Sequence, residues 1–313
     1  MDISVVIPLY NKERYILRAI SSVINQNTPA AEIVVIDDGS TDNGANEVRQ
    51  TNDKRVRLIQ QKNAGEGAAR NRGVEESSCN IVAFLDADDE WKPDFLTHIQ
   101  RLINNFPDCG AYGTAYEIIN PGGSITYPDF NEIPPPPWIG IIPNFFSVMQ
   151  SGNIFCSSSV VIPKEIFIKL KGFPEGVIQG ADRMLWVKLG INYPIAFSSS
   201  PQAIIHGEAI NRASEPFVSE SATANLIDSM LENGTIPYSL ISEINDYNTY
   251  LKVQKVKHRI KAGRSKSARD LLREIKQNKK YKYSYWWLYF WSFIPNKLIL
   301  FIRSMRLNFR RPK

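Results

Sequence analysis

Short apolar runs alternate with helical segments over the first hundred residues of this 313-residue chain. Apolar side chains recur at helical spacing from Tyr15 to Gln26, which predicts an amphipathic helix. Further helices are expected over residues 64–76 and from Pro93 to about Asn105. Continuous apolar runs of strand length lie at Ile3–Leu9, Glu32–Ile36, Val56–Ile59 and Ile81–Leu85. Strands that alternate with helices in this way favour right-handed βαβ units and an α/β fold with a mostly parallel sheet.

The alternation breaks down from Asn120 to Pro143. Pro121-Gly122-Gly123 is typical of a turn, and the prolines at 134–137 predict a stiff segment that cannot pair as a central strand. Two interpretations stay open for this region: a loop that covers or faces a binding site, or an ordered crossing of the surface. Beyond it, the pattern predicts strands over Ser157–Ile162 and Ala203–His206, helices over Lys164–Leu170 and Gly180–Gly190, and largely helical structure over Phe217–Ile275.

Charge is divided unevenly along the chain. Of 37 basic and 32 acidic residues, 19 basic and two acidic ones fall in Lys252–Lys313, which leaves 18 basic and 30 acidic residues before it. An acidic body with a strongly basic tail indicates that the tail meets an anionic surface, either lipid or nucleic acid.

The tail also carries a compact aromatic block, Tyr283–Ile294, followed by Pro295 and a shorter apolar run, Leu298–Ile302. Spanning a bilayer takes about 20 consecutive apolar residues, and Pro295 interrupts this run too early. Aromatic segments flanked by Lys and Arg suit the interface of an anionic membrane. Nucleic acid is not expected, because its aromatic contacts would be spread over a folded platform. A helix that docks on the body or on a partner subunit is the alternative.

The N-terminus and the cysteines favour a cytoplasmic protein. The start, Met1-Asp2 followed by a short apolar run, lacks the basic residues and longer apolar core of a signal peptide. The three cysteines are far apart and odd in number, so they indicate neither a disulfide framework nor zinc. We expect a protein attached peripherally to the inner face of the plasma membrane.

Carboxylates cluster directly after two of the predicted strands. Asp37 and Asp38 follow one apolar run, and Asp86, Asp88 and Asp89 follow another. In open α/β sheets, ligands bind outside the carboxyl ends of the strands, so both clusters should meet at one site. Their mutual repulsion is costly unless a cation or a donor-rich ligand offsets it. This arrangement predicts a metal-assisted site, against the alternative of an Asx-rich turn with a helix N-cap at Asp89.

Four motifs occur in order along the first half of the chain: ISVVIPLYN at 3–11, VIDDGSTD at 35–42, NAG at 63–65 with ARNRG at 69–73, and FLDADD at 84–89. Together they resemble the family 2 glycosyltransferases of the GT-A fold, closely over about 110 residues and loosely to about His206. The resemblance implies a Rossmann-like sheet flanked by helices in a catalytic domain over 1–215. Its nucleotide-sugar half would lie at about 1–110 and its acceptor half at about 111–215. Residues 216–313 would form a helical basic and aromatic extension.

The resemblance also implies a donor site for a UDP-sugar. Asp38 would bind the uracil ring beside Asp37, and Arg70 would contact the donor unless it serves only as an ion-pair partner of the acidic cluster. A divalent ion, Mn²⁺ or Mg²⁺, would offset the leaving diphosphate, held by carboxylate oxygens. Asp88 would be its direct ligand, with Asp86 on the ribose or sharing the metal. The remaining residues expected around the nucleotide-sugar are Pro8, Tyr10, Asn11 and Ala87.

An inverting transfer needs a carboxylate that removes the acceptor proton. In the family this group comes from an acidic pair before Leu-Trp. Here Asp182 precedes Met184-Leu185-Trp186 by two residues, but Ala181 replaces the first acid. Asp182 is therefore the candidate base, with a helix N-cap as its alternative role. His206 is a further candidate metal ligand, although a lone histidine is more often structural.

These observations predict a glycosyltransferase that adds a sugar to a glycan or lipid-linked glycan acceptor in bacterial surface polysaccharide synthesis, such as lipopolysaccharide or capsule. Two alternatives remain. A nucleotidyltransferase of related fold would release pyrophosphate, and a catalytically silent scaffold would bind nucleotide without turnover; Ala181 alone favours the latter.

Overall fold

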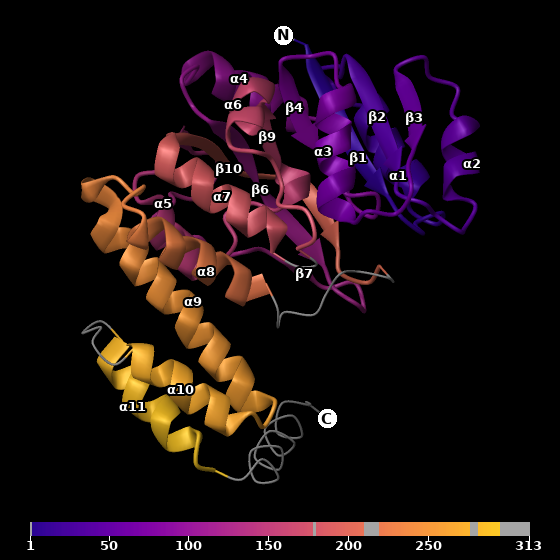
Figure 1. Ribbon diagram of the computed structural model, residues 1–313. Coiled ribbons are helices and arrows are strands. Elements are labelled where there is room, and N and C mark those ends of the chain that lie inside the picture. Colours follow the sequence, from indigo (N-terminus) through magenta and orange to yellow (C-terminus); the bar gives the residue numbers. More distant parts are fainter. Residues whose placement is uncertain (1, 178–179, 210–218, 276–280, 295–313) are drawn as a thin grey trace. The chain divides into compact units, whose positions relative to one another are not determined.

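The computed structural model describes residues 2–177, 180–209, 219–275 and 281–294. The chain divides into two compact units, 1–214 and 215–313. The first unit contains a mixed, mostly parallel sheet with helices on both faces, and the second is helical (Figure 1).

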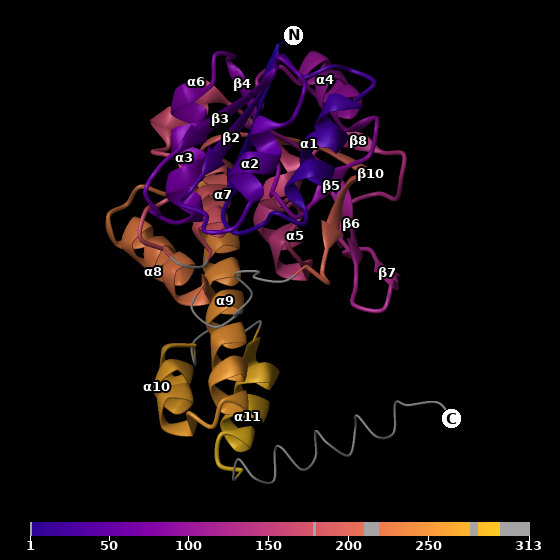
Figure 2. The same ribbon diagram turned by 90° about the vertical axis from the view of Figure 1, so that its right-hand side faces the viewer.

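The sheet of the first unit has the strand order β3-β2-β1-β4-β9-β6-β10-β5. β1 pairs in parallel with β2 and β4, and β6 pairs in parallel with β10. β9 is antiparallel to both β4 and β6, so these two strands run in the same direction. Two short strands lie off this order, with β7 paired to β6 and β8 paired to β10 (Figure 2). The strands are β1 Ile3–Leu9, β2 Glu32–Asp37, β3 Val56–Gln60, β4 Ile81–Phe84, β5 Glu90–Trp91, β6 Ala111–Ile119, β7 Ile125–Thr126, β8 Ile139–Ile141, β9 Val160–Pro163 and β10 Ile195–His206.

Successive residues of β1 face opposite sides of the sheet, as the two-residue period of a strand requires. Val5 and Ile7 belong to the core cluster that includes α1 and α4, whereas Val6 contacts α3. A Cβ at Gly73 of α3 would lie 2.2 Å from the Val6 side chain, so only glycine allows this close approach. The helices of this unit are α1 Ile16–Ile24, α2 Gly44–Arg49, α3 Glu66–Glu76, α4 Phe95–Asn105, α5 Phe145–Ser151, α6 Lys164–Lys169 and α7 Ala181–Asn192.

The α/β fold and its mostly parallel sheet confirm the prediction, with differences in detail. Residues 157–159 form a 3₁₀ turn, so the strand expected from Ser157 begins at Val160. The last strand is longer than expected, because the pattern after Ile195 is broken by Pro201, where the β6–β10 register shifts. The sequence pattern did not identify α2, α5 or β6, although β6 is buried over most of its length.

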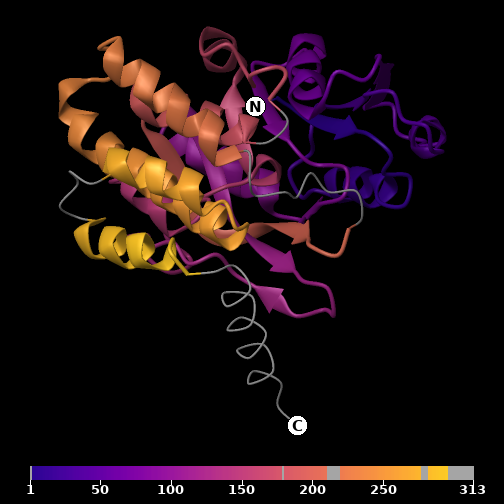
Figure 3. The same ribbon diagram turned by 60° about the horizontal axis from the view of Figure 1, so that its bottom comes forward.

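The second unit consists of α8 Ser219–Glu232, a 3₁₀ turn at Tyr238–Leu240, α9 Ile241–Lys261, α10 Ser265–Ile275 and α11 Lys282–Trp291. α10 and α11 lie alongside α9 (Figure 3), and their buried side chains form a separate apolar core. The helical prediction is confirmed over its described residues. Within the described part of the chain, no helix has the length and apolar character needed to cross a membrane. The apolar run Leu298–Ile302 lies outside the described residues.

Candidate functional site

The loops after β1 and β2 lie side by side, because Leu9 and Asp37 are paired at the ends of their strands. Asn11 has a left-handed backbone, φ 53°, and its side-chain oxygen accepts a 2.8 Å hydrogen bond from the Thr41 amide. The Asn11 amide in turn donates to the Ser40 hydroxyl at 3.1 Å. Tyr10 is half-exposed on this surface, while Pro8 is buried within β1. Asn11 therefore ties the two loops together and leaves the Tyr10 ring open to a ligand.

Asp37 and Asp38 are buried and heavily hydrogen-bonded. Asp37 accepts from the Ser40 amide and the Gln60 side chain, at 2.9 and 2.8 Å. Asp38 accepts three hydrogen bonds from segment 61–65, including the Gly65 amide at 2.8 Å. A carboxylate offers about four acceptor positions, so one remains for a ligand N–H. Holding segment 61–65 in place is a role of Asp38 that the sequence motif did not indicate.

Asp86 and Asp88 each face a cation. Asp86 lies 2.6 Å from the Arg70 guanidinium, and Asp88 lies 2.7 Å from the Lys12 ammonium. Both aspartates follow the end of β4, with the buried Ala87 between them. Each ion pair uses one oxygen of its carboxylate, so the second oxygen lies outside the pair.

Arg70 is the centre of the cluster. Its side chain is 4% exposed, and one of its terminal nitrogens, Nη2, lies 2.6 Å from both Glu66 and Asp86. Burial opposes its positive charge, but Asp86, Glu66 and Asp182 outweigh that effect and raise the pKa of Arg70. Among the residues that the structure describes, none accepts a hydrogen bond from its Nε–H, and this atom is fully buried.

Asp182 belongs to the same cluster. A Cβ at Gly67 would lie 3.9 Å from the Cβ of Ala181, so the first turns of α3 and α7 are adjacent. The Arg70 charge lowers the pKa of Glu66, but burial and the negative charges of Asp86, Asp182 and Asp88 outweigh it and raise that pKa. Gly180 is the N-cap of α7, so the alternative N-cap role expected for Asp182 is wrong. Asp182 instead accepts from the Arg183 amide at 2.7 Å.

The donor chemistry of this cluster fits a divalent cation. Four carboxylates, Glu66, Asp86, Asp88 and Asp182, lie in this cluster with the cations Arg70 and Lys12, and the Arg18 guanidinium donates to the Asp88 carbonyl. No three His, Cys, Asp or Glu side chains form a metal cage within the described ranges. Mg²⁺ commonly takes only one or two protein carboxylates and completes its shell with water and substrate phosphates. Asp88 and Asp86 would hold such an ion.

Asp89 and His206 are bound within the protein. Asp89 accepts from the Ser158 hydroxyl at 2.6 Å and from the His206 amide at 3.2 Å, which joins the end of β4 to β10. Asp89 is not a helix N-cap, because α4 begins at Phe95 after Asp94. The His206 ring lies 3.0 Å from Glu90 and 2.7 Å from Glu208. The two ring nitrogens of His206 thus face carboxylates of the protein.

The sequence motifs missed Glu66 and Lys12. Glu66 occupies a position at the start of α3 that carries no motif signal, and it meets Asp86 only through Arg70. Lys12 follows the first motif by one residue and lies 76 positions from its partner Asp88. The position of a positive side chain directly after that motif was the one feature of the sequence that could have indicated a role for Lys12 in the site.

The chain is similar in sequence to known glycosyltransferases. Residues 4–170 match the model of glycosyl transferase family 2. An uncharacterised glycosyltransferase of Nostoc sp. is 35% identical over 205 residues, which are 63% of this chain and 60% of the relative. The glycosyltransferase GlyA of Streptococcus pneumoniae is 37% identical over 118 residues, 37% of this chain and 17% of the relative. The match to these relatives thus covers less than two thirds of their length.

A solved structure shares the fold. The S. aureus TarS fragment 1–349, crystallised with UDP-GlcNAc, matches with a TM-score of 0.65 at 19% sequence identity. The match covers 91% of this chain and 78% of that one. The likeness confirms the GT-A architecture expected from the four motifs.

Proposed function

Because the chain belongs to glycosyl transferase family 2, whose model matches residues 4–170, we propose that it transfers a sugar from a UDP-sugar to a hydroxyl of a glycan acceptor with inversion. The observation that carries this proposal is the acidic cluster at this site: Asp86 contacts the buried Arg70, Asp182 lies close enough to raise the pKa of Arg70, and Asp88 is paired with Lys12. The cluster lies where α/β sheets bind ligands, outside the carboxyl ends of the strands.

The proposed donor site lies on the loops after β1 and β2. Tyr10 offers an exposed ring for the base, and Asp38 retains one acceptor position for a uracil N–H. The crystallised complex of TarS with UDP-GlcNAc supports a UDP-sugar as donor. Arg70 would contribute its positive charge to the donor site, while Glu66 and Asp86 hold its guanidinium in place.

A divalent cation, Mn²⁺ or Mg²⁺, would be held by Asp88 and Asp86 and would neutralise charge on the departing diphosphate. Lys12 already lies 2.7 Å from Asp88 and brings a further positive charge to the same place. The half-buried surroundings strengthen these interactions relative to water. A role of His206 in binding the ion stays a prediction, and Glu90 and Glu208 face its two ring nitrogens.

Asp182 is the proposed base. It would take the proton of the acceptor hydroxyl as that oxygen forms a bond to the anomeric carbon and the bond from that carbon to the UDP oxygen breaks. One hydrogen bond, from the Arg183 amide, orients its carboxylate. Ala181 adds no second acid, but Glu66 stands at the adjacent first turn of α3 and supplies a carboxylate to the same cluster.

The second unit supports attachment to an anionic membrane. Four aromatic side chains of α11 recur at intervals of three and four and are more than half exposed: Tyr283, Trp286, Trp287 and Phe290. Tyr285 and Leu288, on the opposite side of the helix, are buried in the core with α9 and α10. One helix face is thus packed and the other presents aromatic rings, the arrangement of an interfacial helix. A lipid-linked glycan made on the cytoplasmic side, for a bacterial surface polysaccharide, is the acceptor class that such attachment favours.

Turnover of a sugar-nucleotide panel tests the proposal. The full chain would be incubated with UDP-, GDP- and ADP-sugars and Mn²⁺, and both nucleoside diphosphate and pyrophosphate would be measured. We expect UDP to be released from one or two UDP-sugars, faster when a glycan acceptor is added. Pyrophosphate release would instead indicate a nucleotidyltransferase, and UDP binding without release, even with lipid-linked acceptor, would indicate a silent scaffold.

A further inference from the structure

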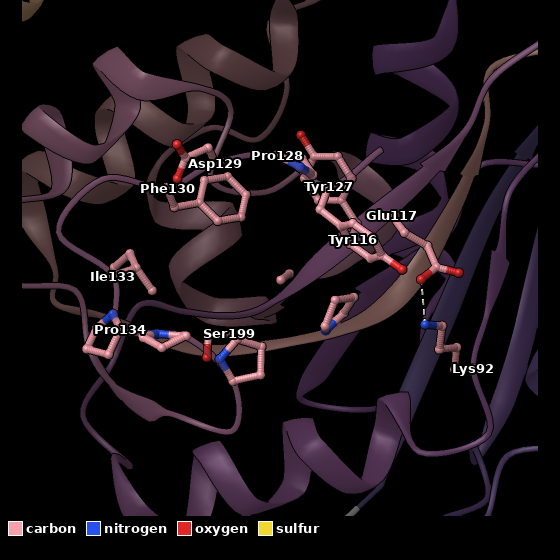
Figure 4. Close-up of a pocket in the computed structure, with 14 residues that line it drawn as sticks. Lys92, Tyr116, Glu117, Tyr127, Pro128, Asp129, Phe130, Ile133, Pro134 and Ser199 are labelled. Carbon is pink, nitrogen blue, oxygen red and sulfur yellow. Dashed lines mark hydrogen bonds and ion pairs between the residues drawn. The ribbon is translucent and has the colours of Figure 1, made fainter. Parts of the chain in front are cut away.

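A cavity of about 540 Å³ lies between β6, β10 and segment 127–136 (Figure 4). This volume falls within the range of about 300–1,000 Å³ that is typical of small-molecule sites. Its lining is mainly apolar, with the rings of Tyr127 and Phe130 and a series of prolines. The charged side chains among its lining residues are Lys92, Glu117 and Asp129.

The wall formed by segment 127–136 is fixed to the body of the first unit. Phe130 packs edge-on against Phe197 of β10, with ring centroids 5.8 Å apart. Just beyond the segment, the Trp138 carbonyl accepts from the Ser199 amide at 3.0 Å. Glu132 accepts from the Ser147 hydroxyl at 2.6 Å. The region that the sequence left open is thus both ordered and part of a cavity wall.

Hydrogen bonds connect the cavity to the candidate base. The Tyr116 hydroxyl, on the cavity side of β6, donates to the Asn153 carbonyl at 2.9 Å. The Asn153 side chain accepts from the Arg183 guanidinium at 3.1 Å, and the Arg183 amide donates to Asp182. The Asp182 charge is close enough to help raise the pKa of Tyr116, an effect that is led by burial and that Arg183 opposes.

The cavity is also connected to the candidate metal ligands. Lys92 follows Asp88 by four residues, and its amide donates to the Gln202 carbonyl of β10 at 2.8 Å. β4 and β6 run in the same direction, so Asp86 and Tyr116 lie toward the same end of the strands. In the strand order, the cavity strands β6 and β10 lie on the side of β4 away from β1 and β2.

We propose that this cavity binds a neutral sugar residue of the acceptor, an inference that rests on the proposed function. Aromatic rings and prolines suit the apolar face of a pyranose, and a few polar groups at the edge suit its hydroxyls. The charges argue against an anionic sugar or a phosphate. Lys92 is paired with Glu117 at 2.7 Å, and Asp129 adds a second carboxylate, so the lining bears an excess of negative charge.

Saturation-transfer NMR on the full chain tests this proposal. The probes are neutral methyl glycosides of glucose, galactose, mannose and N-acetylglucosamine, with methyl glucuronide as the anionic comparison. We expect at least one neutral glycoside to bind in preference to the glucuronide. Tyr127 is 60% exposed, so Tyr127→Ala should leave the fold intact and weaken this binding about tenfold. Tyr127→Phe keeps the ring and should retain binding, as should the control Tyr238→Ala, a site 92% exposed in the second unit.

Three outcomes would overturn the assignment: no neutral glycoside binds, the glucuronide binds more tightly, or Tyr127→Ala binds as well as the unaltered chain. The UDP-release panel separates this failure from failure of the proposed function. UDP release without glycoside binding would support the proposed transferase and show that the cavity is not its acceptor site. Tyr127-dependent binding of a neutral glycoside without UDP release would support the sugar site and contradict the proposed transfer reaction.

Discussion

Arg70 shows how a buried charge can be kept in a fold. A guanidinium that is 4% exposed would be costly to bury alone, and Glu66 and Asp86 offset that cost by contacting the same nitrogen at 2.6 Å. The arrangement holds α3 to the end of β4. Arg70 is thus both a packing element and a proposed donor contact.

Arg70→Lys should lower kcat/KM for the UDP-sugar about 10- to 100-fold, because an ammonium lacks the planar, fixed donor geometry of the guanidinium that holds Glu66 and Asp86. The change would be measured as UDP release over a series of donor concentrations. Arg72→Lys is the matched control on the same helix, since Arg72 is half-exposed and is paired with Glu75 and Glu76 at the helix surface. Equal kcat/KM for Arg70→Lys and the unaltered chain would remove Arg70 from the donor site.

Glu32 makes the fold sensitive to acid. Burial alone would raise its pKa, but hydrogen bonds from Ser4, Ser78 and Arg57 outweigh burial and lower it from 4.5 to about 2. The ionised form is favoured in the fold, so this stabilisation is complete above about pH 5 and is lost as the pH falls from 4.5 toward 2. Its upper limit is about 3 kcal/mol.

Glu32→Gln should therefore unfold at a lower temperature than the unaltered chain at pH 7, and the difference should shrink by pH 3. Thermal unfolding of both proteins at the two pH values measures it. Glu75→Gln, at a side chain 69% exposed, should show little difference at either pH. A Glu32→Gln deficit that stays constant with pH would mean that packing, not ionisation, accounts for the effect.

At the residue scale, the sequence could identify side chains suited to catalysis or metal binding, but not the side chains that contact them. Asp86, Asp88 and Asp182 could be proposed because each stands in a motif, and the structure brings all three close to Glu66. Glu66 itself could not be proposed, since only its contact with Arg70 brings it into the cluster. The contact between Arg70 and Asp86, which lie 16 positions apart, depends on how the strands pair.

At the scale of elements, strands and helices with a strong period were predictable. β1, β2 and β4 are continuous apolar runs because they are buried on both faces. The end of β10 was predicted, whereas its first part was not, because Pro201 and the register shifts beside it break the pattern. α11 was expected only as an aromatic segment, and the structure shows which of its rings are exposed.

The exposed face of α11 predicts binding to anionic vesicles. The full chain should sediment with vesicles that contain phosphatidylglycerol, and Trp286→Ser combined with Trp287→Ser should weaken binding at least about tenfold, because two apolar rings no longer enter the interface. Tyr238→Ala, another exposed aromatic of the same unit, is the control. Sedimentation unaffected by the double change would favour a docking role for this helix.

At the scale of the whole molecule, the sequence indicated an α/β body and a helical basic extension, but not the order of strands. The antiparallel β9 lies between β4 and β6 and joins the two halves of the sheet. The carboxyl ends of β4 and β6 therefore lie at the same end of the sheet. No periodic pattern carries that information, because it depends on which edges pair after the chain has left β4. The pairing brings the donor loops and the cavity wall together in one unit.

The most direct test is the metal dependence of UDP release by the unaltered chain and by Asp88→Asn, with the donor selected from the panel. We predict release with Mn²⁺, its loss with EDTA, and a reduction of about 100-fold or more in Asp88→Asn, because that change would remove the charged ligand that we propose for the ion. Glu75→Gln should match the unaltered chain. Release that is unaffected by EDTA and undiminished in Asp88→Asn would contradict the account.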